Sequence, residues 1–98
     1  MKPVEKIWFN GEMTAWNDAK IHILSHIIHY GYGVFEGIRC YETTDGRRAI
    51  FRLKEHLRRL EESAHILRLK NPWSTEMMTA ACEQVVRDNG LKSCYIQI

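Results

Sequence analysis

The chain has 98 residues and a mass of 11.6 kDa, which suffices for one small domain with a modest core. Its 45% hydrophobic and 27% charged residues are typical of a globular protein, and its ten aromatic residues argue against disorder. Six glycines, two prolines and three cysteines exclude a collagen-like or disulfide-rich chain. Fourteen basic residues against twelve acidic ones give a net charge of +2, and because the charges are scattered, nucleic acid is not an expected partner.

The first predicted elements are a hairpin and a short helix. Asn10-Gly11 supplies the two positive-φ residues of a tight type I′ turn, so strands are expected on either side of it. Further along, Ser25 can cap a helix that runs to Tyr30 and ends at Gly31.

The rest of the chain alternates between strands and helices. Turn residues and hydrophobic periodicity predict strands over 34–43, 48–53 and 94–98, and helices over 54–69 and from Ser74 to Asn89. This order indicates an α+β fold, with a mostly antiparallel sheet and two helices packed on one face. The last strand reaches residue 98 without a turn, so residues 1–98 are expected to be an N-terminal piece of a longer protein.

The cysteines and the lack of targeting or membrane-spanning segments indicate the cellular compartment. The cysteines Cys40, Cys82 and Cys94 are odd in number and form no CxxC pair, which favours a reduced, intracellular compartment. The N-terminal residues resemble no signal peptide, and no stretch approaches the ~20 apolar residues of a membrane span. We therefore expect a soluble, cytoplasmic protein with no membrane partner.

The strand over 34–43 carries the first candidate site. Alternation places Phe35, Gly37 and Arg39 on one face, and Glu36 and Ile38 on the other. An aromatic wall, a gap above the glycine and a cation in a row suit a small anionic ligand. A half-buried strand whose arginine reaches solvent explains the same pattern equally well.

Two neighbouring arginines on the following helix differ in their surroundings. Arg58 lies four residues before Glu62, which predicts a solvated surface pair. Arg59 lies beside the apolar stripe, where a guanidinium can bind an anion such as phosphate. A surface pair with Glu55, four residues earlier, is the alternative for Arg59.

Three histidines have a spacing that invites comparison with metal sites. On one continuous helix, His22, His26 and His29 would present three imidazoles to one side. Because Ser25 marks a helix start, His22 is expected outside the helix, and no metal site is predicted.

Four ordered segments carry a resemblance to a known family. They are IWFNGE (7–12), SHIIHYG (25–31), VFEGIR (34–39) and EHLRRL (55–60). Together they resemble the branched-chain amino acid aminotransferases, fold-type IV enzymes of amino-acid biosynthesis that use pyridoxal 5′-phosphate (PLP). The resemblance runs along essentially all of the chain and implies the N-terminal small domain of such an enzyme.

The resemblance implies a function and its partners. The activity is PLP-dependent transamination of leucine, isoleucine or valine with 2-oxoglutarate, in a homo-oligomer whose partners are small-molecule amino and 2-oxo acids. D-amino acid aminotransferases and aminodeoxychorismate lyases share the fold, but the run over 35–39 favours the branched-chain group. An alternative of another class is a non-catalytic binding or oligomerisation module.

The resemblance also implies roles for individual residues. Arg59 matches the arginine that binds the cofactor phosphate. Phe35 and Tyr95 match aromatic walls of the substrate pocket, with Gly37 and Arg39 near it, and Tyr30 matches a tyrosine that reaches the neighbouring subunit's site.

Two departures from the family pattern stand out. The family's catalytic lysine lies in the large domain, and no lysine here matches its motif, so the chain alone is expected to be inactive and to bind PLP weakly or not at all. Gln97 stands where the family commonly has an arginine that binds the substrate carboxylate, so an uncharged amide replaces a cation.

Overall fold

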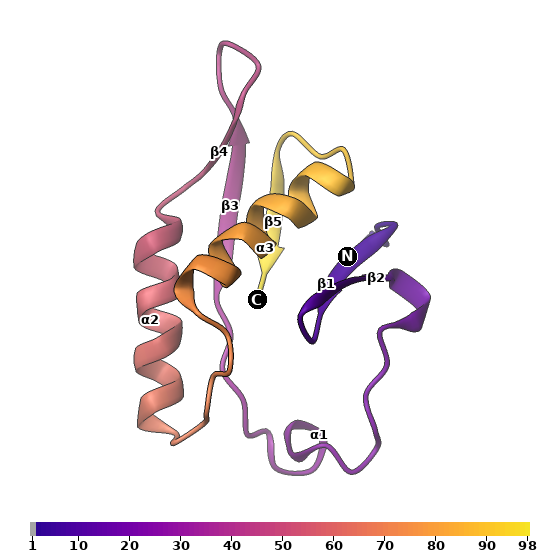
Figure 1. The fold of residues 1–98 in the computed structure, drawn as a ribbon, viewed down its shortest axis with the longest axis vertical. Helices are drawn as coiled ribbons and strands as arrows, with labels where there is room; N and C mark the ends of the chain where they lie inside the picture. Colours follow the sequence, from indigo (N-terminus) through magenta and orange to yellow (C-terminus); the bar gives the residue numbers. More distant parts are fainter. Residues whose placement is uncertain (1) are drawn as a thin grey trace.

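The computed structural model, which describes residues 2–98, opens with the predicted hairpin (Figure 1). β1 (Lys6–Phe9) pairs antiparallel with β2 (Glu12–Ala15). Asn10 and Gly11 turn the chain with φ angles of 50° and 96°, as a type I′ turn requires. A short 3₁₀ turn, η1 (Trp16–Asp18), follows the hairpin.

The predicted short helix is present as α1 (His26–Tyr30). Gly31 ends it with a φ of 60°, as expected for a left-handed cap. Ser25 precedes the helix but does not cap it through its side chain. Its hydroxyl donates instead to the backbone carbonyl of His22 at 2.7 Å, because the chain turns at His22 just before the helix.

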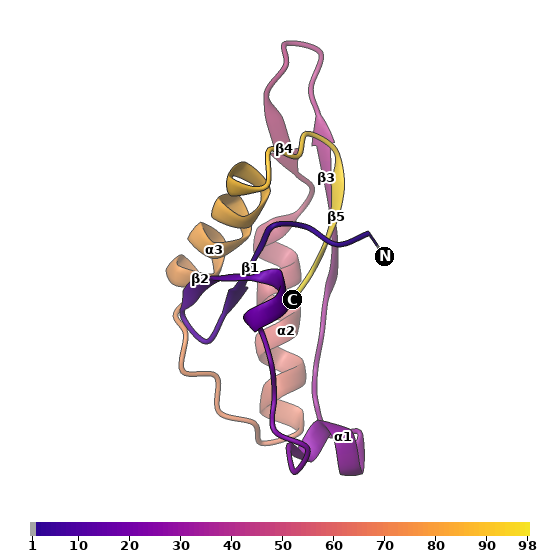
Figure 2. The same ribbon diagram turned by 90° about the vertical axis from the view of Figure 1, so that its right-hand side faces the viewer.

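The main sheet has three antiparallel strands in the order β4-β3-β5. Its strands are β3 (Gly37–Glu42), β4 (Arg48–Ile50) and β5 (Cys94–Gln97). β3 and β4 are both shorter than predicted, and β4 ends early because the chain leaves the sheet after Ile50 to begin a helix. The β3–β4 hairpin extends at one end of the molecule and α1 lies at the other (Figure 2).

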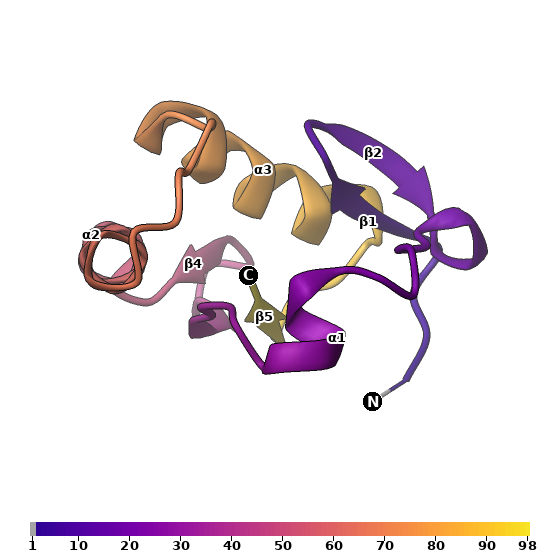
Figure 3. The ribbon, with the colours of Figure 1, turned by 90° about the horizontal axis from the view of Figure 1, so that it is seen from below.

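Two long helices cover one face of this sheet (Figure 3). They are α2 (Leu53–Ile66) and α3 (Thr75–Asp88). The predicted cap of α3 is confirmed, since the Ser74 hydroxyl accepts a hydrogen bond from the Met77 amide at 3.1 Å. The core forms between sheet and helices from Ile38, Cys40, Ile96, Leu57, Leu60, Met78, Cys82 and Val86. The α+β fold predicted from the sequence is therefore confirmed.

Asn89, which ends α3, attaches the N-terminal hairpin to the rest of the fold. Its side-chain oxygen accepts from the amides of Glu5 and Lys6, both at 3.0 Å. Its side-chain nitrogen donates to the carbonyls of Lys6 at 2.8 Å and Val85 at 2.7 Å. The three bonds to Glu5 and Lys6 place β1 beside α3, as Figures 1 and 3 show.

Membrane insertion of a helix finds no support in residues 2–98. None of the helices in this part of the chain has both the length and the apolar character that a bilayer span requires.

Candidate functional site

The face of the main sheet that the helices leave uncovered carries most of the predicted site. Ile38 and Cys40 point into the core with at most 1% of their surface exposed. On the other face, Phe35 is 69% exposed and Tyr95 is 48% exposed. The predicted alternation of this strand is therefore confirmed, and the face with the candidate residues is open.

Arg39 and Tyr95 meet on this open face. They are cross-strand partners in the β3–β5 register. The guanidinium carbon of Arg39 lies 5.5 Å from the centre of the Tyr95 ring, which is a cation–π distance. The contact gives this face a positive charge held against an aromatic surface.

The gap predicted above Gly37 is occupied. A Cβ atom at this position would lie 2.9 Å from Cζ of Tyr95 and closer still to its hydroxyl oxygen. Tyr95 reaches this place because β5 runs antiparallel to β3, which brings it diagonally across from Gly37. The glycine thus makes room for a tyrosine of the same chain.

Arg59 has a different partner from the one that helix spacing suggested. Its Nε and Nη2 donate to Glu36 Oε1 and Oε2 at 2.6 and 2.7 Å. Glu55 pairs instead with Arg52 at 3.5 Å, so the predicted Arg59–Glu55 pair is wrong. The reason is that α2 packs on the sheet with Arg59 toward the end of β3.

The predicted pair between Arg58 and Glu62 is present. Their side chains approach to 3.7 Å, and both are largely exposed. Arg58 and Arg59 are therefore adjacent arginines in different surroundings, and only Arg59 contacts a buried carboxylate.

Glu36 and His56 are the site residues that the sequence interpretation missed. Glu36 is only 5% exposed, and His56 Nδ1 lies 2.7 Å from its Oε2. The Arg59 hydrogen bonds, assisted by the His56 contact and opposed by burial, lower the pKa of Glu36 to about 2. The sequence feature that could have identified Glu36 was the alternation of the strand, which placed this carboxylate on the core face.

Tyr30 lies apart from the other predicted residues. It ends α1, is 77% exposed, and packs edge-on against His26 with ring centres 5.7 Å apart. Among the described residues, no hydrogen bond or aromatic contact joins it to the open face of the sheet. Gln97, by contrast, lies on β5 opposite Gly37 and shares a face with Tyr95, as alternation predicted.

The spacing of the three histidines does not correspond to a metal site in the described part of the chain. Within residues 2–98, no three His, Cys, Asp or Glu side chains gather closely enough to hold an ion. His22 lies outside α1, as expected, and its Nδ1 accepts from the Leu24 amide at 3.0 Å.

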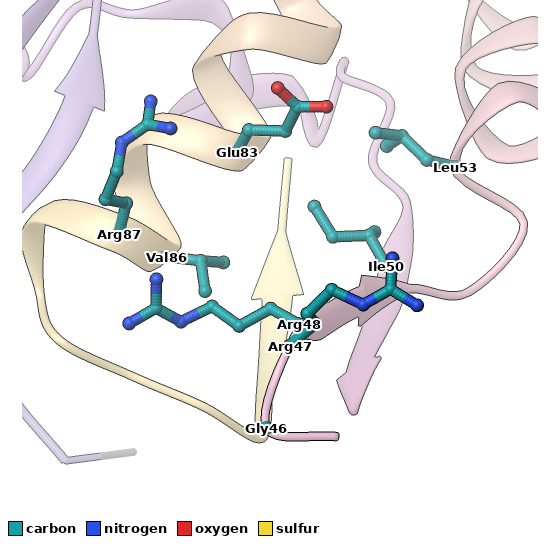
Figure 4. Close-up of a pocket in the computed structure, with 8 residues that line it drawn as sticks. All are labelled: Gly46, Arg47, Arg48, Ile50, Leu53, Glu83, Val86 and Arg87. Carbon is teal, nitrogen blue, oxygen red and sulfur yellow. The ribbon is translucent and has the colours of Figure 1, made fainter. Parts of the chain in front are cut away.

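An open groove of about 650 Å³ lies on the helix side of the sheet, between β4 and α3 (Figure 4). Its lining consists of Gly46, Arg47, Arg48, Ile50, Leu53, Glu83, Val86 and Arg87. Arg47 is paired with Asp45 at 2.8 Å. None of the predicted site residues lines this groove, so the candidate site remains the open sheet face with the Glu36–Arg59 pair behind it.

Comparison with protein families identifies the fold. Residues 33–98 match the model for amino-transferase class IV. The chain belongs to the class IV aminotransferase family. The match spans the open sheet face and the Glu36–Arg59 pair.

Individual class IV aminotransferases resemble the chain closely. It is 49% identical over 96 residues to the branched-chain-amino-acid aminotransferase of Escherichia coli K12, covering 98% of this chain and 31% of that protein. A T.th. branched-chain amino acid aminotransferase solved with pyridoxamine 5′-phosphate superposes with a TM-score of 0.94, at 47% identity over 99% of this chain and 32% of that one. The same enzyme complexed with N-(5′-phosphopyridoxyl)-L-glutamate gives a TM-score of 0.92, at 49% identity over 96% and 32%.

These similarities confirm the resemblance stated from the sequence. The chain spans about a third of the length of the curated relatives it matches and corresponds to their N-terminal portion.

Proposed function

We propose that the chain is the small domain of an enzyme that transfers amino groups between branched-chain amino acids and 2-oxoglutarate with PLP as cofactor. The observation that carries this proposal is the pair formed by Arg59 and the buried carboxylate of Glu36. The relatives named above support it, because two of their structures contain phosphorylated pyridoxyl or pyridoxamine compounds.

The donor set at Arg59 fits the phosphate of PLP. A guanidinium has five N–H groups, and two of those on Arg59 donate to Glu36. Three remain on a side chain that is 65% exposed, and a guanidinium edge matches the geometry of phosphate oxygens. When bound, PLP supplies the carbonyl group and electron-withdrawing ring on which amino-group transfer depends.

The open sheet face fits the apolar part of a branched-chain substrate. Phe35 and Tyr95 offer exposed aromatic surface, which suits an aliphatic side chain in a pocket closed by other parts of the enzyme. Arg39 contributes positive charge near this surface. In this proposal Gly37 permits Tyr95 to stand where it does, and Tyr30 reaches the site of a second subunit.

The remaining parts of the machinery lie elsewhere in the proposed enzyme. The catalytic lysine belongs to a large domain, and the substrate carboxylate is bound without the arginine that Gln97 replaces. The proposed assembly is a homo-oligomer in the cytoplasm, in which the large domain and a second subunit cover the open face.

One experiment tests the proposed function. The polypeptide is produced as its gene encodes it, incubated with PLP, leucine and 2-oxoglutarate, and assayed for glutamate. D-alanine replaces leucine in a parallel reaction to distinguish the D-amino acid aminotransferases. Glutamate formation above the rate with free PLP is expected with leucine only. A gene product without a lysine-bearing large domain and without turnover would favour the non-catalytic binding module.

A further inference from the structure

We propose that Glu36 is a positioning residue that holds the guanidinium of Arg59 by one edge and leaves its other edge free for the cofactor phosphate. This inference rests on the proposed function, and it assigns a task to a carboxylate that itself has no free edge to offer a ligand. The argument begins with the rigidity of Glu36.

Glu36 is fixed through both its backbone and its surroundings. Its amide donates to the carbonyl of Ile98 at 3.0 Å, and the Ile98 amide donates to the Glu36 carbonyl at 3.1 Å, which extends the β3–β5 ladder by one pair. Among residues 2–98, it is the one charged side chain that is buried. The Glu36 carboxylate therefore has a fixed position.

The Arg59 side chain, in contrast, is not fixed by burial. It is 65% exposed, and a long arginine in solvent loses considerable rotamer entropy when it is held in one place. The two short bonds to Glu36 use Nε and Nη2, so the carboxylate takes one complete edge of the planar group. The N–H groups on Nη1 and the second N–H on Nη2 remain, and they point away from Glu36 because the guanidinium is flat.

His56 holds the same carboxylate from a second direction. It lies one turn before Arg59 on α2, with Nδ1 2.7 Å from Glu36 Oε2. The ionised carboxylate only accepts hydrogen bonds, so Nδ1 of His56 carries the proton in this contact. With both oxygens engaged, the plane of the carboxylate is set, and the direction of the free guanidinium edge is set with it.

A purely structural role makes a different prediction from a positioning role. If Glu36 served only to attach α2 to the sheet, its loss would weaken binding of any ligand in the site to a similar degree. If Glu36 orients Arg59 toward phosphate, its loss weakens binding of PLP far more than binding of pyridoxal, which lacks the phosphate. The effect then also disappears when Arg59 is absent.

The test is a double-mutant cycle in the polypeptide as its gene encodes it. Dissociation constants for PLP and for pyridoxal are measured for the wild type, Glu36→Gln, Arg59→Ala and the double variant. Glu36→Gln is expected to weaken PLP binding about tenfold and pyridoxal binding less than about twofold. In the Arg59→Ala background, Glu36→Gln is expected to have no further effect on PLP binding, because interacting residues are not additive. Glu62→Gln is the matched control, since it removes an exposed carboxylate paired with Arg58.

The outcomes separate this inference from the proposed function. A wild-type protein that binds no PLP overturns the proposed function and this role together. A wild type that binds PLP, with equal losses of PLP and pyridoxal in Glu36→Gln or with additive effects in the cycle, overturns the positioning role alone. Should Glu36→Gln fail to fold, Arg59→Lys takes its place, because lysine keeps the charge but lacks a second edge. PLP binding as tight as in the wild type would then overturn the role.

Discussion

Tyr95 stands in the space that a side chain at residue 37 would occupy, so Gly37 and Tyr95 determine each other's environment. A Cβ at Gly37 would lie 2.9 Å from the Tyr95 ring carbon Cζ and 3.0 Å from Cε2. Both distances are too short for ordinary contact, and the tyrosine is the group able to move, because it is half exposed.

Gly37→Ala is therefore expected to displace Tyr95 while leaving the fold intact. The cost in unfolding free energy should be about 1 kcal/mol, at the low end for an overpacked position. In the proposed enzyme, the Michaelis constant for leucine should rise. Steady-state kinetics of Gly37→Ala with and without Tyr95→Ala make the comparison. The alanine at 37 should have little further effect once the tyrosine is gone, and an equal effect in both backgrounds would refute the coupling.

Arg59→Ala is expected to weaken PLP retention at least about tenfold, because a charge-assisted contact to phosphate is lost. Arg58→Ala serves as the control, since Arg58 differs by one position and makes only an exposed pair with Glu62. Dissociation constants from the cofactor absorbance decide the matter. Equal dissociation constants for the two variants would contradict the assignment of Arg59 to phosphate binding.

The ionisation of Glu36 should make the fold sensitive to acid. Its pKa is about 2 in the folded chain against an ordinary 4.5, so the ionised form is stabilised by folding. Its contribution is complete above about pH 4.5 and is lost as the pH falls toward 2.

The measurement is urea unfolding of the wild type and Glu36→Gln between pH 7 and pH 2. The difference in unfolding free energy is expected to be constant at neutral pH and to shrink below about pH 4.5, where the unfolded carboxyl takes up its proton. A difference that is independent of pH over this range would contradict the assignment.

Gly11→Ala should destabilise the N-terminal hairpin for two reasons. The residue has a φ of 96°, and a Cβ would lie 2.7 Å from the Trp73 ring. Gly46→Ala is the matched control, because Gly46 has a φ of 81° with nothing within 4 Å of its Cβ position. The backbone strain should cost about 1–2 kcal/mol in each, and Gly11→Ala should cost more. Thermal unfolding measures the stability of both variants. Equal melting temperatures would show that the Trp73 ring moves aside without a cost in stability.

The 98-residue chain by itself should be inactive and should self-associate. It carries exposed apolar side chains on and just before α1, among them Ile23, Leu24 and Tyr30, and Phe35 on the open sheet face, each at least 67% exposed. Apolar surface of this kind favours association in water. Light scattering should show a dimer or larger species, and the leucine–2-oxoglutarate assay should show only the rate of free PLP. A monomer at high concentration would argue against the first expectation, and turnover against the second.

The sequence by itself determined the elements and the faces of the strand that carries the site. Asn10-Gly11 specifies a hairpin because few residues accept positive φ, and Ser74 specifies a helix start because its hydroxyl satisfies a free amide. Alternation assigned Phe35 and Arg39 to the open face, since successive side chains of a strand point to opposite sides. These signals are local, and the structure preserves them.

Only the tertiary structure decided which residues meet. Arg59 and Glu36 are 23 residues apart, and their contact depends on where α2 sits along the end of β3. The spacing within the helix favoured Glu55, because a local partner is visible in the sequence and a distant one is not. Tyr95 reaches the space above Gly37 for the same kind of reason, through the register of β5 on β3. Both contacts arise from packing between elements, where a shift of one residue in register or one helical turn in position selects a different partner.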